Sequence, residues 1–356
     1  MRQVPAPPTF DEIVALAAAD GIEHVGVAPA ATLERARKAI HDRIDAGLDG
    51  GLGFTFRNPE RATDPHRAVD GARSIIVAAR SYALDEPARP AGPQARVGRY
   101  AWVDHYAPLR RTLRAIAKRL KAAGERAVVL CDDNGLVDRE AAYQAGLGWF
   151  GKNANLLLPG AGSWFVLGSV VTTATYEPSP APVGDGCGAC RRCGDACPTG
   201  AIVAPGVIDA DRCLAWVLQK PGPIPRHLRE AVGDRIYGCD DCQDVCPPTV
   251  RFGGRHTPPP PDQVDVEVEA WVDVLDLLDA DDETLLARHG RWYLAGRDPR
   301  WLRRNALVVL GNTGDARDTR TQATLARYRQ HDDALLAEHA AWASARLALD
   351  EGSTAR

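Results

Sequence analysis

Two kinds of hydrophobic pattern alternate along the first half of the chain. Apolar residues recur at helical spacing in residues 10–20, 32–47 and 109–123. They form short apolar or alternating runs in residues 22–28, 74–82, 126–131 and 164–173. Thr9-Phe10-Asp11-Glu12 fits a capping box at the start of the first helical segment. The pattern predicts an α/β (α+β) domain with a central sheet over residues 1–177.

The remaining chain is divided by two proline-rich segments. Residues 178–186 separate the α/β domain from a cysteine-rich stretch, and residues 257–261 follow that stretch. From about residue 264 the apolar spacing is helical to the end. We therefore predict three domains, over residues 1–177, 178–260 and 261–356.

The helical tail carries a weak internal repeat. Two of its segments match at an offset of 34 residues, pairing Asp298, Leu302, Asn305 and Ala306 with Asp332, Leu336, His339 and Ala340. The match suggests a helical repeat. Two ordinary amphipathic helices would give the same periodicity.

Composition and charge narrow the class of protein. The chain has 356 residues, a net charge of -4 and 45% hydrophobic residues, which is the balance of a soluble globular protein. A protein that coats nucleic acid without specificity would be basic, so any contact with nucleic acid must come from a local patch. No apolar run approaches the roughly 18 residues of a membrane span, and carboxylates flank the apolar run near the N-terminus, unlike a signal peptide. We expect a cytoplasmic protein without membrane contact, so its nine cysteines need a role other than disulfides.

Eight of the nine cysteines lie close together in the cysteine-rich stretch. The first run has the spacing C-x2-C-x2-C-x3-C-P and comprises Cys187, Cys190, Cys193 and Cys197. The second run, C-x2-C-x3-C-P, comprises Cys239, Cys242 and Cys246. The first spacing is that of bacterial ferredoxins with two [4Fe–4S] clusters, in which the fourth cysteine ligates the other cluster.

The number of thiolates matches two such clusters. Cys213 is the candidate for the cysteine that the second run lacks. Cluster one then takes Cys187, Cys190, Cys193 and Cys246, and cluster two takes Cys197, Cys213, Cys239 and Cys242. Zinc sites use pairs of C-x2-C or cysteine with histidine, a pattern that does not explain these runs. We predict that Cys131, at the end of a predicted strand, is a buried and inert thiol.

Two segments of the α/β domain are unusual. One is residues 131–140, CDDNGLVDRE, and the other is residues 145–168, AGLGWFGKNANLLLPGAGSWFVLG, which holds six glycines. Glycines at this density let the backbone approach a flat ligand closely. Taken alone, both segments also suit ordinary turns.

These segments together with the cysteine runs resemble the epoxyqueuosine reductase family. The resemblance rests on AGLGWFGKN, GSWFVLG, CGACRRCGDACPTGAI and YGCDDCQDVCP, and it covers the chain from about residue 10 into the tail. It implies a cobalamin-dependent reductase, related to reductive dehalogenases, with two [4Fe–4S] clusters in a ferredoxin-like domain and a HEAT-like tail. The implied reaction is the last step of queuosine synthesis on tRNA, in which cob(I)alamin, reduced by the clusters, attacks the epoxide.

The resemblance also implies roles for single residues. Asp132 matches the proton donor to the epoxide oxygen, a role that suits a carboxyl group whose pKa is raised by burial. The predicted cobalamin contacts are Arg57, Tyr100, Lys152, Asn153, Ser163, Trp164 and Asp240. The implied partners are a tRNA anticodon stem-loop and a low-potential electron donor, and we expect the chain to act as a monomer.

The sequence departs from the family at several of these positions. The family usually reads aspartate, tyrosine, histidine where this chain has His105, Tyr106 and Ala107. After Cys213, Ala215 and Leu218 replace two residues that usually carry hydroxyl groups. These changes leave open a related reductase of a small-molecule epoxide or organohalide. A non-catalytic electron carrier is a further alternative.

Two basic stretches could contact an RNA. Residues 291–304 hold five arginines and one acid, with Trp292, Tyr293 and Trp301 interleaved, and such surfaces can stack on unpaired bases. Residues 110–114 hold Arg110, Arg111 and Arg114. A helix whose solvated arginines cover a packed tryptophan would have the same sequence pattern.

Overall fold

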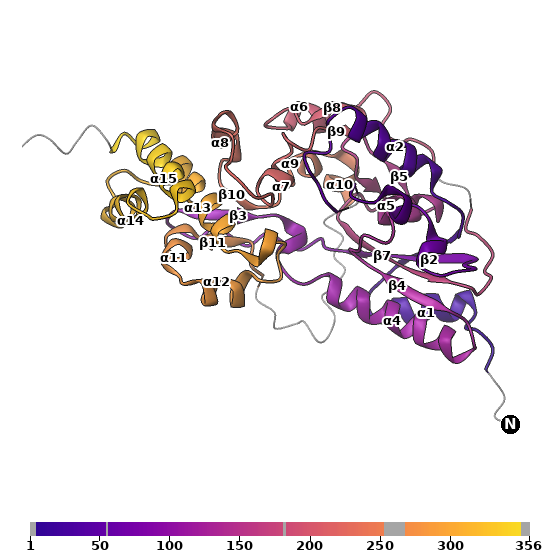
Figure 1. Cartoon of the computed structure of the whole chain (residues 1–356). Coiled ribbons are helices and arrows are strands. Elements are labelled where there is room, and N and C mark those ends of the chain that lie inside the picture. The colour runs from indigo at the N-terminus through magenta and orange to yellow at the C-terminus, as the bar shows by residue number, and fades with distance from the viewer. Residues whose placement is uncertain (1–4, 55, 181–182, 253–267, 350–356) are drawn as a thin grey trace, which may run out of the picture.

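The computed structural model describes residues 5–54, 56–180, 183–252 and 268–349, and Figure 1 shows their arrangement. The predicted proline-rich segment 257–261 lies outside the described residues. Within the described ranges, no helix is long and apolar enough to cross a membrane.

The N-terminal part is built on a four-stranded antiparallel sheet. Its strands are β1 (His24–Pro29), β2 (Ser74–Ser81), β7 (Phe165–Thr172) and β4 (Ala127–Leu130), in the order β1-β2-β7-β4. Both faces are covered, which explains the unbroken apolar run over residues 75–79 of β2. Ile76 and Ala78 face α1 (Phe10–Ala19) and α4 (Tyr106–Ala122), whereas Ile75 and Val77 face α2 (Glu34–Asp45) and α5 (Asp138–Gln144).

The predicted elements of this part are confirmed with shifts of one to three residues. The capping box is present, since Thr9 Oγ1 accepts the Glu12 backbone N–H and the Glu12 carboxylate accepts that of Thr9. The sheet is antiparallel throughout, and long excursions join its strands. Short elements fill these excursions: α3 (Pro59–Ala62), η1 (Pro65–Arg67), η2 (Arg99–Ala101), β5 (Trp149–Phe150) and β6 (Leu156–Leu157).

The cysteine-rich stretch forms short elements joined by loops. They are α6 (Arg192–Ala196), β8 (Ile202–Ala204), β9 (Val207–Ile208), α7 (Leu214–Val217), α8 (Arg226–Val232), α9 (Asp241–Asp244) and α10 (Pro247–Phe252). Its entry segment is attached to the main sheet, because Ser179 exchanges hydrogen bonds with the backbone of Val27 in β1.

A second sheet joins the three predicted domains. Its strands are β10 (Arg235–Tyr237), β3 (Gln94–Val97) and β11 (Trp271–Asp273), and each comes from a different predicted domain. One hydrophobic core surrounds it, with Trp102, Leu214 and Leu307 among its members. The predicted domain boundaries therefore do not separate one hydrophobic core from another.

The tail is helical, as predicted. It contains α11 (Val274–Asp279), α12 (Asp282–His289), η4 (Ala295–Arg297), α13 (Arg300–Thr313), α14 (Thr319–Arg329) and α15 (Ala334–Arg346). The repeat positions are equivalent in burial, because Leu302 and Asn305 in α13 and Leu336 and His339 in α15 are almost fully buried. Both polar members bond to backbone: Asn305 Nδ2 donates to the carbonyls of Leu218 and Ile236, and His339 Nε2 accepts the Ile224 N–H.

Candidate active site

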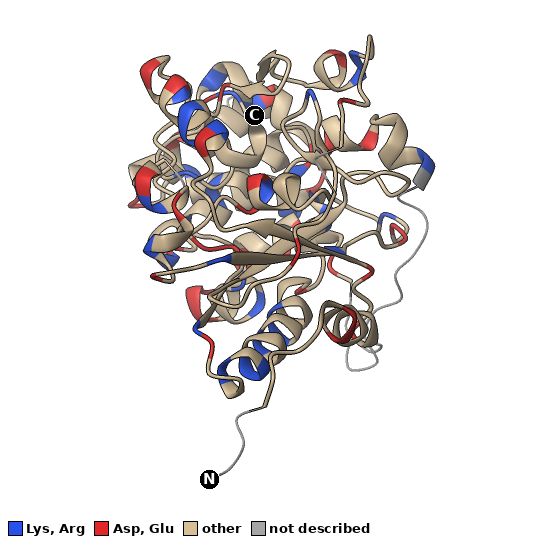
Figure 2. Ribbon diagram, turned by 90° about the vertical axis from the view of Figure 1, so that its right-hand side faces the viewer, with Lys and Arg blue, Asp and Glu red and all other residues tan. Residues whose placement is uncertain are grey.

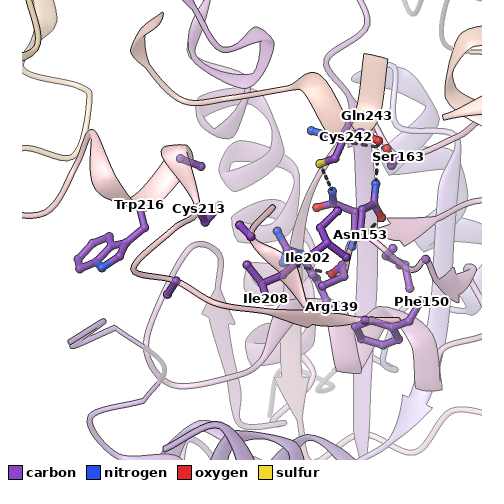
Figure 3. A pocket seen from close by; sticks show the side chains of 18 of the residues that line it. Arg139, Phe150, Asn153, Ser163, Ile202, Ile208, Cys213, Trp216, Cys242 and Gln243 are labelled. Atoms are coloured by element: carbon purple, nitrogen blue, oxygen red, sulfur yellow. Dashed lines mark hydrogen bonds between the residues drawn. The ribbon is translucent and has the colours of Figure 1, made fainter. Parts of the chain in front are cut away.

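A cavity of about 880 Å³ lies between α2, the glycine-rich segment and the cysteine loops. Its size is in the range of cofactor sites. Apolar side chains form much of its wall, among them Ile40, Phe150, Leu156 and Trp216. Figure 3 shows Trp216 and Cys213 on one side of it, with Asn153, Ser163, Cys242 and Gln243 gathered on another.

Glycines let the glycine-rich segment pack directly against other backbone. A Cβ on Gly148 would lie 2.1 Å from the Leu157 carbonyl oxygen, inside the β5–β6 hairpin. Gly162 has a φ of +83°, and a Cβ there would lie 2.5 Å from Thr249 Cα in α10. The glycines therefore place the wall of the cavity against the cysteine-rich region.

A buried hydrogen-bond network joins that wall to the loop of the second cysteine run. Ser163 Oγ donates to Gln243 Oε1 at 2.9 Å, and Tyr82 Oη donates to the same oxygen at 3.2 Å. Asn153 Nδ2 donates to the Cys242 carbonyl at 3.3 Å. Asn153 and Ser163 thus line the cavity and also fix the orientation of the loop that carries Cys242.

Lys152 lines the cavity and binds the loop of the first cysteine run. Its Nζ donates to the carbonyls of Gly188 at 2.6 Å and Cys190 at 2.9 Å. Its ammonium group therefore stabilises a loop that would hold several thiolates.

Tyr100 and Asp240 also line the cavity. Tyr100 Oη accepts from Gln219 Nε2 at 3.0 Å, and Gln219 belongs to the segment where the sequence departs from the family. The buried Asp240 carboxylate accepts the Arg99 backbone N–H at 2.6 Å. Burial raises the Asp240 pKa to about 6, against the lowering effect of that hydrogen bond.

Two predicted contact residues lie outside the cavity wall. Arg57 is exposed, and its neighbour Phe56 is the residue that lines the cavity. The Trp164 ring packs against the Arg99 guanidinium, whose central carbon lies 4.4 Å from the centroid of the ring. The flanking Ser163 and Phe165 line the cavity.

The eight clustered cysteines are all free thiols, and they separate into two groups by position. Cys197, Cys213, Cys239 and Cys242 line the cavity. The charges of Cys187 and Cys190 act on both Cys193 and Cys246, so these four thiols lie near one another. Among the described residues, no three His, Cys, Asp or Glu side chains are arranged to hold a single metal ion.

The surroundings of Cys197 favour ionisation of its thiol. Burial raises its pKa, but hydrogen bonds from the backbone of Thr199 and Ala201 outweigh that effect, so the pKa is lowered. The Ala201 N–H donates to Cys197 Sγ at 3.2 Å. Backbone N–H groups directed at a sulfur favour its thiolate form.

Cys131 is buried, as predicted. Its Sγ donates to the Leu167 carbonyl at 3.6 Å, and burial raises its pKa to about 12. A thiol with so high a pKa is a poor nucleophile and a poor metal ligand.

Asp132 follows Cys131 at the end of β4, and its backbone is left-handed, with φ +54°. Its side chain reaches solvent, but nearby protein displaces enough water to raise its pKa. The Arg110 guanidinium lowers that pKa and the Asp133 carboxylate raises it. The nearby Tyr106, whose pKa Asp132 raises, lines the cavity, so Asp132 lies at the cavity rim.

Asp138 is a functional candidate that the sequence reasoning missed. It is the first residue of α5, and its Oδ1 is buried without a hydrogen-bond partner among the described residues. Its pKa is raised well above the usual range by burial and by the Asp132 carboxylate, while a backbone hydrogen bond from Asp132 lowers it. Two carboxyl groups therefore share this corner of the site. Only their spacing of six residues could have indicated it.

Other cavity residues carried no sequence signal of their own. Arg139, Tyr82 and Gln243 line the cavity, and their side chains come from three distant segments. The Arg35 guanidinium lies over the Tyr143 and Phe150 rings and forms an ion pair with the buried Glu140. Such groups become neighbours only through the fold.

The residues at which this chain departs from the family pattern lie in different surroundings. His105 is 3% exposed, and its pKa is lowered to about 3 by burial and by the charges of Arg80 and Arg291, so the imidazole is neutral. Ala215 lines the cavity, Leu218 is buried and Ala107 is exposed.

The predicted RNA-binding patch at 291–304 is wrong as a continuous basic surface. Trp292 and Trp301 are buried, and Arg304 is buried among backbone carbonyls. Arg303 forms an ion pair with Asp282, and Arg300 forms ion pairs with Asp298 and Asp333. Acids of the chain, among them Asp282 and Asp333 from other elements, therefore pair with the charges of Arg300 and Arg303.

The sequence matches known families in two regions. Residues 186–249 match the 4Fe-4S double cluster binding domain, and residues 62–133 match the family described as Epoxyqueuosine reductase QueG, DUF1730. The matched cluster domain, together with a cofactor-sized cavity lined by four of its thiols, defines an iron–sulfur oxidoreductase.

Curated relatives and solved structures identify the family. The epoxyqueuosine reductase of Lactococcus garvieae is 33% identical over 86% of this chain and 87% of its own length. That of Xanthomonas campestris is 35% identical over 84% of this chain and 85% of its own. A crystal structure of epoxyqueuosine reductase with a tRNA-Tyr epoxyqueuosine-modified stem loop superposes with a TM-score of 0.84 at 27% identity, over 95% of this chain and 89% of the other. The chain belongs to the epoxyqueuosine reductase family.

A structure of the Bacillus subtilis enzyme matches equally well, with a TM-score of 0.83 and 27% identity over 95% of this chain and 90% of that one. It is described as having its catalytic aspartate loop swung out of the active site.

Proposed function

We propose that the protein reduces epoxyqueuosine to queuosine in tRNA, with cobalamin bound in the cavity and electrons supplied through two [4Fe–4S] clusters. The observation that carries the proposal is the composition of the cavity wall. It brings together four cysteines of the double-cluster domain, the glycine-rich segment and Tyr106, which lies beside Asp132. The solved relative with a modified tRNA stem loop supports tRNA as the substrate.

The residues of the cavity suit cobalamin. Its apolar wall would contact the flat ring, and Tyr100, Asn153, Ser163 and Asp240 offer polar groups for the amide side chains of the ring. Lys152 would act indirectly, because its ammonium group already binds two carbonyls of the first cysteine loop. Arg57 and Trp164 would contact cobalamin from positions outside the cavity wall. Once reduced, bound cobalamin supplies a strong nucleophile for the epoxide carbon.

The positions of the thiols support the predicted ligand sets. Cluster two would be held by Cys197, Cys213, Cys239 and Cys242, next to the cofactor cavity. Cluster one would be held by Cys187, Cys190, Cys193 and Cys246, farther from it. Electrons from a low-potential donor would then pass from cluster one to cluster two and on to the cavity.

Asp132 is the proposed proton donor. Epoxide opening leaves an alkoxide that needs a proton, and a carboxyl group with a raised pKa retains one nearer to neutral pH. Tyr106 lines the cavity near Asp132 and would hold the substrate oxygen beside the acid.

We propose that the chain acts as a monomer with an α/β domain, a ferredoxin-like domain and a HEAT-like tail. The equivalent burial of the two repeat segments in α13 and α15 supports the repeat. The shared second sheet suggests that the three parts move as one body.

Turnover of a modified anticodon stem-loop tests the function. The reconstituted wild type, with cobalamin and a low-potential reductant, should convert epoxyqueuosine to queuosine. Asp132→Asn should retain iron and cobalamin but lose about 10²–10⁴ in rate, the usual contribution of a general acid. The matched control Asp133→Asn should be much milder. If the wild type ignores the stem-loop but reduces a free epoxide or halide, the small-molecule alternative is right, and the change at Ala215 in the cavity wall would be its first explanation.

Metal analysis tests the cluster ligands. Anaerobic wild-type protein should contain about eight irons per chain. Cys197→Ala should lower that count, whereas Cys131→Ala should leave it unchanged because its thiol is buried away from the clusters. One equivalent of zinc without iron after anaerobic reconstitution would contradict the assignment.

A further inference from the structure

The outward face of α4 carries a row of cations. Apolar residues Leu109, Leu113, Ile116 and Leu120 bury the other face against the sheet, which fixes the orientation of the helix. The exposed or half-exposed face presents Arg110, Arg111, Arg114, Lys118 and Lys121. Figure 2 shows blue ribbon along the helix near the N-terminal trace. At 1.5 Å per residue the row is about 16 Å long.

Three of these cations are free to bind a ligand. Within the described residues, Arg114, Lys118 and Lys121 have no hydrogen bond or ion pair with another side chain, and all three are exposed. The arginines of residues 300–304 differ, because acids or carbonyls of the chain already bind them.

These three cations also line one hollow. It has a volume of about 490 Å³ and lies between α4 and the edge strand β4. Its remaining lining is apolar, from Ala117, Ala127, Val128 and Val129. The charge of the hollow is therefore wholly positive, a surface that attracts phosphate groups.

The row of cations leads to the proposed proton donor. Arg110, at the other end of the row, donates to the Cys131 carbonyl at 3.5 Å, and its charge acts on the carboxyl group of Asp132. β4 runs beside α4 and continues directly into Asp132. A strand bound along α4 would thus be directed to the rim of the cavity.

We infer that the outward face of α4, from Arg114 to Lys121, binds the sugar–phosphate backbone of the RNA substrate and guides its modified base to the cavity. The inference rests on the proposed function and adds the surface that holds the substrate. Each strand of a DNA duplex carries one phosphate per about 3.4 Å of helix axis, so a row of this length can meet more than one phosphate of a nucleic acid. Lysine and arginine contacts of this kind position a nucleic acid without reading its sequence.

An acidic peptide is the competing occupant, because β4 has an open edge and peptides can add to such strands. The observations favour RNA. The row of cations continues to Asp132, and a peptide bound at the edge of β4 would not require cations.

The experiment measures binding of a fluorescent anticodon stem-loop, without epoxyqueuosine, to the cluster-loaded protein at several salt concentrations. The unmodified RNA separates backbone binding from chemistry. The test variant is Arg114→Glu/Lys118→Glu. The control variant, Arg288→Glu/Arg317→Glu, makes the same change in net charge on the tail, where both arginines are exposed and paired with acids.

The test variant should bind the stem-loop about tenfold or more weakly than the wild type. We also expect a change in the slope of log K, the logarithm of the RNA-binding constant, against the logarithm of salt concentration. This slope should become shallower by about 1 for each phosphate group that the altered side chains no longer bind. The control variant should bind as the wild type does. Cobalamin reduction should be unchanged in both, which shows that the fold and clusters are intact.

Three outcomes would overturn the inference. If the test variant binds the stem-loop with wild-type affinity and salt dependence, the surface is wrong while the proposed function stands. If the wild type binds no stem-loop RNA, the tRNA function fails together with the surface. If the test variant loses binding to a poly-glutamate peptide but keeps the RNA, α4 is a docking surface for an acidic protein.

Discussion

Asp132 lies between two charges that act on it in opposite directions. The Arg110 guanidinium lowers its pKa, and the Asp133 carboxylate raises it, in addition to the larger effect of burial. An acid that must donate a proton is active only below its pKa. The rate of a reaction that depends on Asp132 should therefore fall as the pH rises through that pKa.

This balance predicts opposite shifts in two variants. Arg110→Met removes the cation that favours the carboxylate, so the pKa of Asp132 rises and the alkaline fall in kcat moves to higher pH. Asp133→Asn removes the carboxylate that disfavours ionisation, so the fall moves to lower pH. The measurement is kcat against pH at saturating stem-loop, so that any change in RNA binding is excluded.

The Asp132→Asn variant is the control, because its residual rate should lack this fall. Shifts in the same direction for both variants, or none in either, would remove Asp132 as the group that titrates.

At the scale of elements, the glycine-rich segment positions the wall of the site. Gly148, directly before β5, packs against the backbone of Leu157 in β6, and Gly162 brings the segment against α10. The Ser163 N–H then donates to Thr249 Oγ1 at 3.1 Å. The contact joins the α/β part to the end of the second cysteine run.

Gly162→Ala should break this contact. The new Cβ would lie 2.5 Å from Thr249 Cα, a backbone atom that cannot move aside, and the residue would keep a left-handed φ of +83°. We expect a lower apparent Tm and weaker cobalamin binding, measured by thermal unfolding and by titration.

Gly160→Ala separates the two causes. Gly160 is also left-handed, with φ +69°, but a Cβ there would meet open space. This control should show only the conformational cost of about 1–2 kcal/mol. Equal losses in the two variants would mean that the contact with α10 contributes nothing.

At the scale of the whole molecule, a buried arginine helps to join the tail to the cysteine-rich region. Arg304 in α13 donates to the carbonyls of Lys220, Gly222, Val217 and Leu218, which lie in and after α7. Burial and the charge of Arg229 lower its pKa to about 9. The carbonyl oxygens compensate for the loss of water around the guanidinium.

Arg304→Met should destabilise the protein strongly. It keeps most of the side-chain volume but removes the guanidinium donor of the Val217, Lys220 and Gly222 carbonyls, whereas Leu218 keeps the Asn305 amide, and each buried group left unsatisfied costs about 1–3 kcal/mol. We expect an apparent Tm lower by many degrees in thermal unfolding. Arg317→Met, at an exposed arginine of the tail, should change stability by about 0.5 kcal/mol or less. A wild-type Tm in the Arg304 variant would mean that the hydrogen bonds to α7 are dispensable.

The sequence by itself determined the local elements and the chemistry of the clusters. The three helices and four strands predicted in the first 177 residues followed from apolar periodicity, because each of these elements must bury one face or both. The amphipathic pattern of α4 fixed even its basic face, since Leu109, Leu113, Ile116 and Leu120 must face the sheet. The cysteine spacing identified the double-cluster domain because a loop of fixed length holds neighbouring ligands.

Only the tertiary structure decided which polar groups act together. It placed Asp138 beside Asp132 and joined Tyr82 to Gln243, 161 residues away. It also neutralised the arginines of residues 300–304 through Asp282, Asp333 and distant carbonyls, while it left Arg114, Lys118 and Lys121 of α4 exposed to water. The reason is physical: the pKa of a group and the availability of a charge depend on the burial and on the partners that the fold supplies, and those partners are remote in the sequence.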